Sequence, residues 1–140
     1  MAGDRLEPRD LSLEFTVKTD REAYNLEALV RKIGEDLLVA IWGGERPHIG
    51  AIAVAQPRPS LRDQRVRSAT ASVFCYPGHK DDVVAKEAAE KISSALNTNV
   101  TVTAGMHWEG IDESGIEAVI ANSRDLVKMI IEKITTKEQK

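Results

Sequence analysis

The sequence lacks most of the residues and motifs that point directly to a biochemical activity. It has a single cysteine, Cys75, so no disulfide can form within one chain, and this fits a reducing compartment. No apolar run approaches the roughly 20 residues of a membrane-spanning helix, and no signal-peptide pattern follows Met1. P-loop, G-x-G-x-x-G, G-x-S-x-G and paired C-x-x-C motifs are all missing. We therefore expect a cytoplasmic protein without a standard nucleotide fingerprint.

An excess of charge of either sign is missing too. The chain has 19 Lys and Arg against 22 Asp and Glu, a formal net charge of -3. Binding to a nucleic-acid backbone requires a clustered cationic surface, so we expect no nucleic-acid partner, and we expect no membrane. The 42% hydrophobic and 29% charged residues are those of an ordinary globular protein, and 140 residues make one domain.

The first half of the chain has the residue pattern of β-strands. Leu11, Leu13, Phe15 and Val17 alternate with polar residues, which indicates a half-buried strand. The segment 24–33 fits both a helix face and a strand. The turn-like Gly34-Glu35-Asp36 and the short apolar run 37–42 favour two paired strands. Further strands are expected over 49–55 and 69–76, with Pro57 and Pro59 ending the first of these.

The second half has the periodicity of helices. A helix is expected from Asp81 or Asp82, either of which can serve as its N-cap, to Asn97. Another is expected from 112–113 onward, with a short strand over 99–103 between the two helices. The order βββββαβα predicts an α+β two-layer sandwich, a mainly antiparallel sheet of about six strands with both helices on one face. We assign residues 1–22 to an N-terminal extension with the first strand, 23–136 to the single domain and 137–140 to a frayed tail.

The strand segments 37–42 and 49–55 are apolar on both of their alternating faces. Two helices can cover only one face of the sheet, so the other face must find a different partner. We expect a second copy of the chain to cover it, in a homodimer or a homotrimer.

Three histidines, His48, His79 and His107, occur where glycine or proline breaks the pattern. If the strands over 49–55 and 69–76 pair antiparallel, His48 and His79 lie at the same edge of the sheet. Three interpretations remain open: a zinc site made by all three histidines, contact with a phosphate, or ordinary polar loop residues. The wide sequence spacing gives no local support to the metal site.

A phosphate site has some support at Gly78-His79-Lys80, which directly precedes a helix N-terminus. Asp81-Asp82 oppose it, because they place carboxylates at the same helix end. The loop arginines Arg58, Arg62, Arg65 and Arg67 could bind phosphate or could simply be solvated. Gly43 and Gly44 could allow a ligand to approach the backbone or could form a turn, and Trp42 or Trp108 could stack on a planar ring. Cys75 fits a small buried hydrophobe.

Several motifs together resemble one family, the LpdD-like domain. They are Gly43 to Ala51, Pro57-Arg58-Pro59-Ser60-Leu61, Ser68-Ala69-Thr70, Gly78-His79-Lys80-Asp81 and Thr103-Ala104-Gly105-Met106-His107. The resemblance runs from about Tyr24 to Ile134. The family is named after a small accessory subunit of bacterial gallate decarboxylase and is described as a prenylated-flavin chaperone.

The resemblance implies a non-catalytic role: binding prenylated FMN or FMN, or helping to load it into a UbiD-type decarboxylase alongside the flavin prenyltransferase. From the sequence, the candidate cofactor-binding residues are Gly43, Gly44, His48, Arg58, Ser60, His79, Lys80 and His107. Two alternatives stay open, a small metal-dependent enzyme using His48, His79 and His107, and a purely structural oligomeric subunit.

Overall fold

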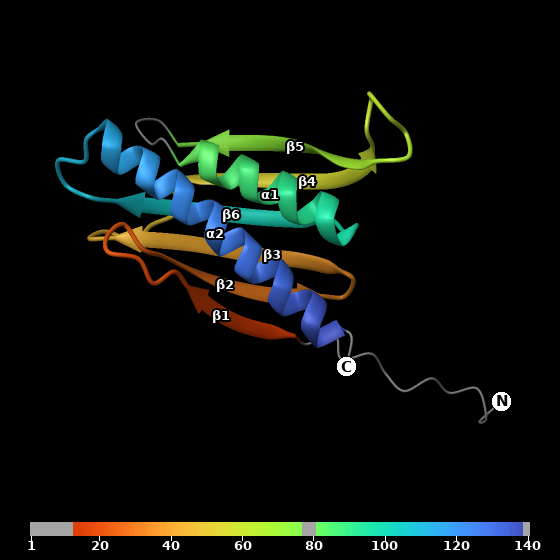
Figure 1. Cartoon of the computed structure of the whole chain (residues 1–140), viewed down its shortest axis with the longest axis horizontal. Coiled ribbons are helices and arrows are strands. Elements are labelled where there is room, and N and C mark those ends of the chain that lie inside the picture. Colours follow the sequence, from red (N-terminus) through yellow and green to blue (C-terminus); the bar gives the residue numbers. More distant parts are fainter. Residues whose placement is uncertain (1–12, 77–80, 139–140) are drawn as a thin grey trace.

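A computed structural model describes residues 13–76 and 81–138 of the chain. Five strands, a helix, a strand and a second helix follow one another, in the expected order (Figure 1). Their bounds are β1 (Glu14–Lys18), β2 (Leu26–Ile33), β3 (Asp36–Gly44), β4 (Ala51–Pro59), β5 (Arg67–Cys75), α1 (Asp82–Leu96), β6 (Val100–His107) and α2 (Glu113–Glu138). The predicted α+β class is confirmed. Neither helix is long and apolar enough to cross a membrane within the described residues.

The six strands form one sheet in the order β1-β2-β3-β6-β4-β5. β6 lies between β3 and β4, parallel to β3 and antiparallel to β4, and all other pairs are antiparallel. Because β6 enters the middle of the sheet, the ends of β3 and β6 and the beginning of β4 meet at one end of the molecule (Figure 1). We call this the glycine end of the sheet, after Gly43, Gly44, Gly50 and Gly105.

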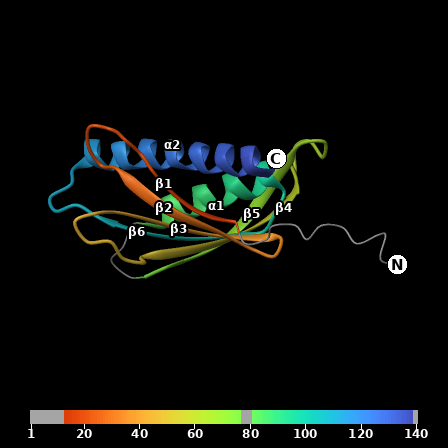
Figure 2. The same ribbon diagram turned by 90° about the horizontal axis from the view of Figure 1, so that it is seen from below.

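Both helices cover the same face of the sheet, as predicted, and the other face carries none (Figure 2). α1 packs on β4, β5 and β6, while α2 packs on β1, β2 and α1. Alternate strand residues point under the helices and are fully buried; among them are Leu26, Val30, Val39, Ile41, Val100 and Val102. Burial of each such side chain contributes roughly 1.5–3 kcal/mol, so the two-residue spacing of the apolar positions decides which face becomes the core.

The fourth strand does not end before its prolines. β4 runs through Pro57 to Pro59. Its part up to Ala55 lies between two neighbouring strands, β5 and β6. Beyond Ala55 the strand pairs with β5 alone. One side of the strand needs no hydrogen-bond donor there, and proline, which has no N–H, is tolerated.

The structure also extends two elements beyond their expected ends. β6 continues past Thr103 through the small residues Ala104 and Gly105, because it pairs with β3 as far as Gly44 and His107. His107 is therefore the last residue of a strand and does not lie in a break after one. α2 continues through Glu138, so Lys137 and Glu138, expected in the tail, are helical.

Candidate functional site

Close backbone contacts hold the glycine end together. A Cβ on Gly105 would lie 1.7 Å from the carbonyl oxygen of His48, and one on Gly44 would lie 2.1 Å from that of His107. Gly44 also has a φ of +83°, a conformation that glycine adopts without strain. A Cβ on Gly43 would meet Leu26, Asn25 and Trp108. The room beside Gly43 and Gly44 is thus filled by the protein's own chain, which favours the structural interpretation of these two residues.

Asp81 is the buried polar centre of this end. It occupies the N-cap position of α1 but makes no side-chain cap hydrogen bond. Its Oδ1 instead accepts the backbone N–H of Met106 at 3.2 Å, and its Oδ2 lies 3.2 Å from Nε2 of His48. The residue is only 4% exposed. One carboxylate therefore links the beginning of α1, the end of β6 and the segment before β4.

The His48 ring is held by acceptors on both nitrogens. Its Nδ1 lies 2.8 Å from the carbonyl oxygen of Arg46, which can only accept a hydrogen bond, so Nδ1 donates. Its Nε2 faces the Asp81 carboxylate. The ring is therefore oriented by a backbone carbonyl on one side and by the Asp81 carboxylate on the other. His48 is directed into the protein here and remains partly exposed, with 26% of its side chain accessible.

His107 has a different partner, although the sheet brings it to the same end as His48. Its Nε2 lies 3.1 Å from Oε2 of Glu109 at the surface. The hydrogen bond from His107 lowers the pKa of Glu109, and the positive charges of His107 and Arg46 lower it further. The backbone carbonyl of His107 accepts the N–H of Glu45 at 2.8 Å. The rim of the glycine end thus mixes acidic and basic side chains.

A cavity of about 400 Å³ opens beside Asp81, between the beginnings of the two helices and the end of β6. Its walls are mostly apolar: Val83, Val84, Met106, His107, Trp108, Ile111, Ile116, Val119 and Ile120 line it with Asp81. The volume lies within the roughly 300–1,000 Å³ of small-molecule sites. An apolar wall with one carboxylate and one imidazole at its margin can hold a flat apolar ring whose polar end reaches the rim.

Only one of the two tryptophans lies at this cavity. Trp108 lines it and packs edge-on against Tyr24, with ring centroids 5.3 Å apart. Trp42 pairs with Gly105 and Glu27 in the sheet, and its neighbours Ile41 and Gly43 are the residues buried under the helices. Because strand side chains alternate, Trp42 lies on the helix-free face.

Arg58 and Ser60 lie far from the other candidate residues. β4 starts at the glycine end and finishes at Pro59, about 26 Å away at the usual rise per strand residue. Arg58 donates to Thr70 Oγ1 and to the carbonyl of Pro59, and the Ser60 hydroxyl accepts the N–H of Arg62. Arg67 donates to the carbonyls of Ser94 and Ala95 at the end of α1. Arg58 and Ser60 therefore do not lie beside His48 and His107, although the sequence placed all four among the candidate cofactor-binding residues.

His79 and Lys80 lie outside the described residues, so their part of the phosphate hypothesis stays a prediction. Strands β4 and β5 do pair antiparallel, the arrangement on which that hypothesis depends. Tyr76 and Asp81, the described residues on either side, both lie at the glycine end, where the Tyr76 N–H donates to Gly50. Among the residues that the structure describes, no three His, Cys, Asp or Glu side chains are grouped to hold a metal ion.

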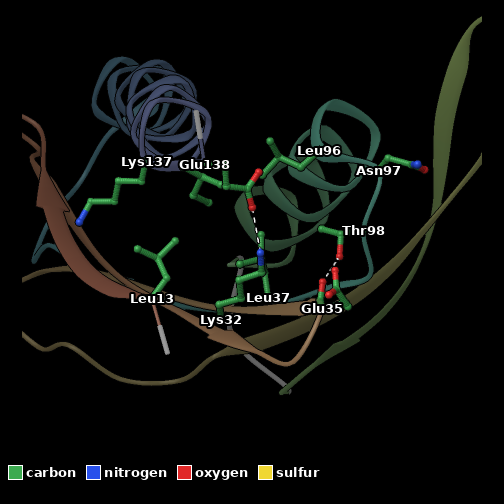
Figure 3. A pocket seen from close by; sticks show the side chains of 10 residues that line it. Leu13, Lys32, Glu35, Leu37, Leu96, Asn97, Thr98, Lys137 and Glu138 are labelled. Atoms are coloured by element: carbon green, nitrogen blue, oxygen red, sulfur yellow. Dashed lines mark hydrogen bonds and ion pairs between the residues drawn. The ribbon is translucent and has the colours of Figure 1, made fainter. Parts of the chain in front are cut away.

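A second, larger cavity of about 950 Å³ lies at the other end of the molecule (Figure 3). Lys32 and Glu138 form an ion pair of 2.9 Å across it, and Leu13, Leu37, Leu96 and Ile134 supply apolar walls. It reaches both ends of the described chain, at Leu13 and Glu138. None of the described candidate residues lines it, and Asp81, the partner of His48, lies at the smaller cavity.

Sequence reasoning missed the main residue of the site, Asp81, which it interpreted only as a helix cap. The available signal was the doubled Asp81-Asp82, since one acidic residue is enough for a cap. It also missed the apolar lining from Met106 and Ile111, because β6 was expected to end before them. No signal in the sequence marks Lys32 and Glu138 as neighbours, because they lie more than a hundred positions apart.

Known proteins share both the fold and the sequence pattern. A chain from the crystal structure of a novel chaperone complex for yeast 20S proteasome assembly matches with a TM-score of 0.56 and 16% identity, over 90% of this chain and 97% of that chain. At that identity the match shows the fold alone, a helix-covered sheet of the α+β class. The family is given by the sequence. Residues 20–135 match the prenylated flavin chaperone LpdD-like domain, and the chain belongs to this family.

A named relative supports the same assignment. Protein LpdD of Lactiplantibacillus plantarum (strain ATCC BAA-793 / NCIMB 8826 / WCFS1) is 29% identical over 121 residues, which cover 83% of this chain and 82% of that protein. The resemblance described from the sequence motifs is therefore confirmed, and with it membership of a chaperone family.

Proposed function

We propose that the protein binds prenylated FMN, or FMN, and delivers it to a UbiD-type decarboxylase, working beside the flavin prenyltransferase. The observation that carries this proposal is the match of residues 20–135 to a family described as prenylated flavin chaperones. No fingerprint of a nucleotide enzyme occurs in the sequence, and an assisting role needs none. The protein acts as a carrier and performs no chemistry on the flavin.

The apolar cavity at the glycine end suits the ring of this ligand better than any other described surface. Met106, Trp108 and Ile111 offer apolar contact to the ring system and to the added prenyl carbons. Trp108 lines this cavity and is held by its contact with Tyr24, so its indole is available to stack on the flavin ring. The phosphate would lie toward the rim, near Arg46, and His79 and Lys80 stay its contacts predicted from the sequence.

Calorimetric titration with FMN and prenylated FMN tests the proposal, with a variant that fills the cavity. Ile116→Trp places a large ring at the cavity mouth, where Ile116 is 40% exposed and the helix can accept it. We expect at least about a tenfold loss of affinity, equal to about 1.4 kcal/mol. The matched control is Leu38→Trp on the helix-free face, 36% exposed, which should bind as the unchanged protein does.

The same titration tests whether His79 and Lys80 contact the phosphate of FMN. Replacing His79 or Lys80 by Ala is expected to weaken FMN by about 1–3 kcal/mol and to leave riboflavin, which has no phosphate, unchanged. The carrier role is rejected if the unchanged protein binds neither flavin. Equal binding by Ile116→Trp and the control would instead exclude this cavity as the binding site. Delivery is measured by the activity gained when apo-decarboxylase is mixed with flavin-loaded protein, compared with the same amount of free prenylated FMN.

A further inference from the structure

The outer edge of β5 is an open edge of the sheet. β5 is the last strand of the sheet and pairs with β4 over its whole length, from Arg67 to Cys75. The N–H of Tyr76 donates to the carbonyl of Gly50 on the β4 side. Backbone groups alternate in direction along a strand, so the N–H groups of Ala69, Ala71 and Val73 point away from β4. No strand of the described chain pairs with them.

The two edges of the sheet differ in how they are protected. β1, at the far edge, has five residues and begins and ends with charged side chains, Glu14 and Lys18. β5 has nine residues, and after Arg67 it contains neither a charge nor a proline. Soluble proteins normally protect an edge strand by shortness, charge, proline or a bulge. Of the two sheet edges in the described residues, the β5 edge is the one suited to pairing with another strand.

Exposed apolar side chains are frequent on β5 and in the segments next to it along the chain. Of the twelve exposed large hydrophobic residues in the described part of the chain, eight fall between Ile49 and Val83, in β4, β5, the loops beside them and the first turn of α1. Phe74 is 59% and Tyr76 is 46% exposed, and their rings pack edge-on at 5.2 Å. An apolar patch beside an unprotected edge marks an interface.

The sequence of β5 is complementary to itself. Its first half has small side chains, Ser68, Ala69 and Thr70, and its second half ends in the large Val73 and Phe74. Antiparallel pairing of two such strands places the large half of one against the small half of the other. We propose that β5 pairs antiparallel with β5 of a second copy, centred near Ala71, so that one sheet continues across a homodimer.

This arrangement specifies the number of copies in the predicted homo-oligomer and the place where the second copy joins. The contact is isologous, so it closes at two copies and leaves no place for a third. The centre at Ala71 places Phe74 opposite the partner's Ser68 on the helix-free face, and Val73 opposite the partner's Ala69 on the helix face. The second copy therefore joins at the edge of the sheet and does not cover its open face.

Multi-angle light scattering at micromolar concentration tests the dimer with two variants. We expect the unchanged protein to run at twice the 15.4 kDa of one chain. Ala71→Pro removes an outward N–H that β4 does not use, and proline is tolerated on edge strands, so this variant should be monomeric. The control is Val54→Lys, which charges a 52% exposed side chain of the helix-free face in β4 and should remain dimeric.

Two outcomes of that measurement would overturn the proposal. One is a monomeric unchanged protein. The other is dissociation by Val54→Lys and not by Ala71→Pro, which would place the second copy on the open face.

Residue-resolved hydrogen exchange tests the same dimer without any variant. The amides of Ala69, Ala71 and Val73 should exchange slowly in concentrated protein and rapidly on dilution. Those of Thr70, Ser72 and Phe74, which face β4, should not change. Rapid exchange of the outward set at every concentration contradicts the edge dimer.

Discussion

Gly105 and Gly110 show two different uses of the same residue type. Gly105 has no room for a side chain, because the His48 carbonyl would lie 1.7 Å from its Cβ. Gly110 has a φ of +69° and nothing within 4 Å of the Cβ position. A backbone atom cannot rotate away as a side chain can, so Gly105 is fixed by contact and Gly110 by conformation alone.

Substitution by alanine should separate these two causes. Gly105→Ala forces the segment at His48 away from β6, and we expect a loss of about 3 kcal/mol or more in the free energy of unfolding. Gly110→Ala should lose only about 1 kcal/mol, the cost of a left-handed residue with a Cβ. Urea denaturation of both variants measures the difference. Equal losses would mean that the strand ends yield more easily than their backbone contact implies.

Asp81 explains why residue roles were harder to predict than elements. Its position before a helix indicates a cap, and Asp81 does occupy the N-cap position of α1, although its side chain makes no cap hydrogen bond. Its carboxylate accepts the N–H of Met106 instead. Met106 lies in β6 beyond Ala104, where the pairing with β4 has ended. The contact joins residues 25 positions apart. Local patterns carry no signal for such a distance.

The elements themselves were mostly predictable, because their patterns are local. Spacing of two identified the strands and the helical spacing of Ala85, Ala88 and Ile92 identified α1. The position of β6 between β3 and β4 was not, because periodicity shows that a strand is half-buried and leaves its neighbours undetermined. The continuation of β4 through Pro57 and Pro59 was not predictable for the same reason, because the sequence of one strand does not show where that strand lacks a neighbour.

The end of α1 supplies a test at the scale of an element. Asn97 closes the helix in the left-handed conformation, with a φ of 54°, and its N–H donates to the carbonyl of Ser93. Asn97→Gly should raise the melting temperature by a few degrees, because glycine enters this region freely, and Asn97→Ala should lower it by about 4 °C. Differential scanning calorimetry compares the two. A gain of stability in Asn97→Ala would exclude the cap as the cause.

At the scale of the whole molecule, the sheet separates the two tryptophans. Trp108 lines the cavity at the glycine end, while Trp42 lies on the helix-free face. The candidate residues are divided as well, since Arg58 and Ser60 lie at the opposite end from His48 and His107. Sequence reasoning placed these residues in one candidate set, although the strand expected over 49–55 already separates His48 from Arg58.

Fluorescence can therefore show which face binds a flavin. We expect FMN to quench the emission of the unchanged protein and of Trp42→Phe, and to leave that of Trp108→Phe almost unquenched, because energy and electron transfer favour the ring in contact. Free N-acetyl-tryptophanamide mixed with FMN corrects for absorption of light by the flavin. Quenching lost in Trp42→Phe and kept in Trp108→Phe would move the site to the helix-free face.

The central position of β6 also sets the order in which the chain can assemble. The strands β1 to β3 form one group and β4 with β5 another, and no ladder joins the two groups directly. Within the sheet of the described residues, β6 (Val100–His107) alone joins them, and it leaves the ribosome after all five other strands. Until then β3 and β4 each expose an apolar inner edge, and closing the sheet requires contacts distant in sequence, which form slowly. The inner edges of β3 and β4 thus lack their native partner until the last strand of the chain has been made and placed between them.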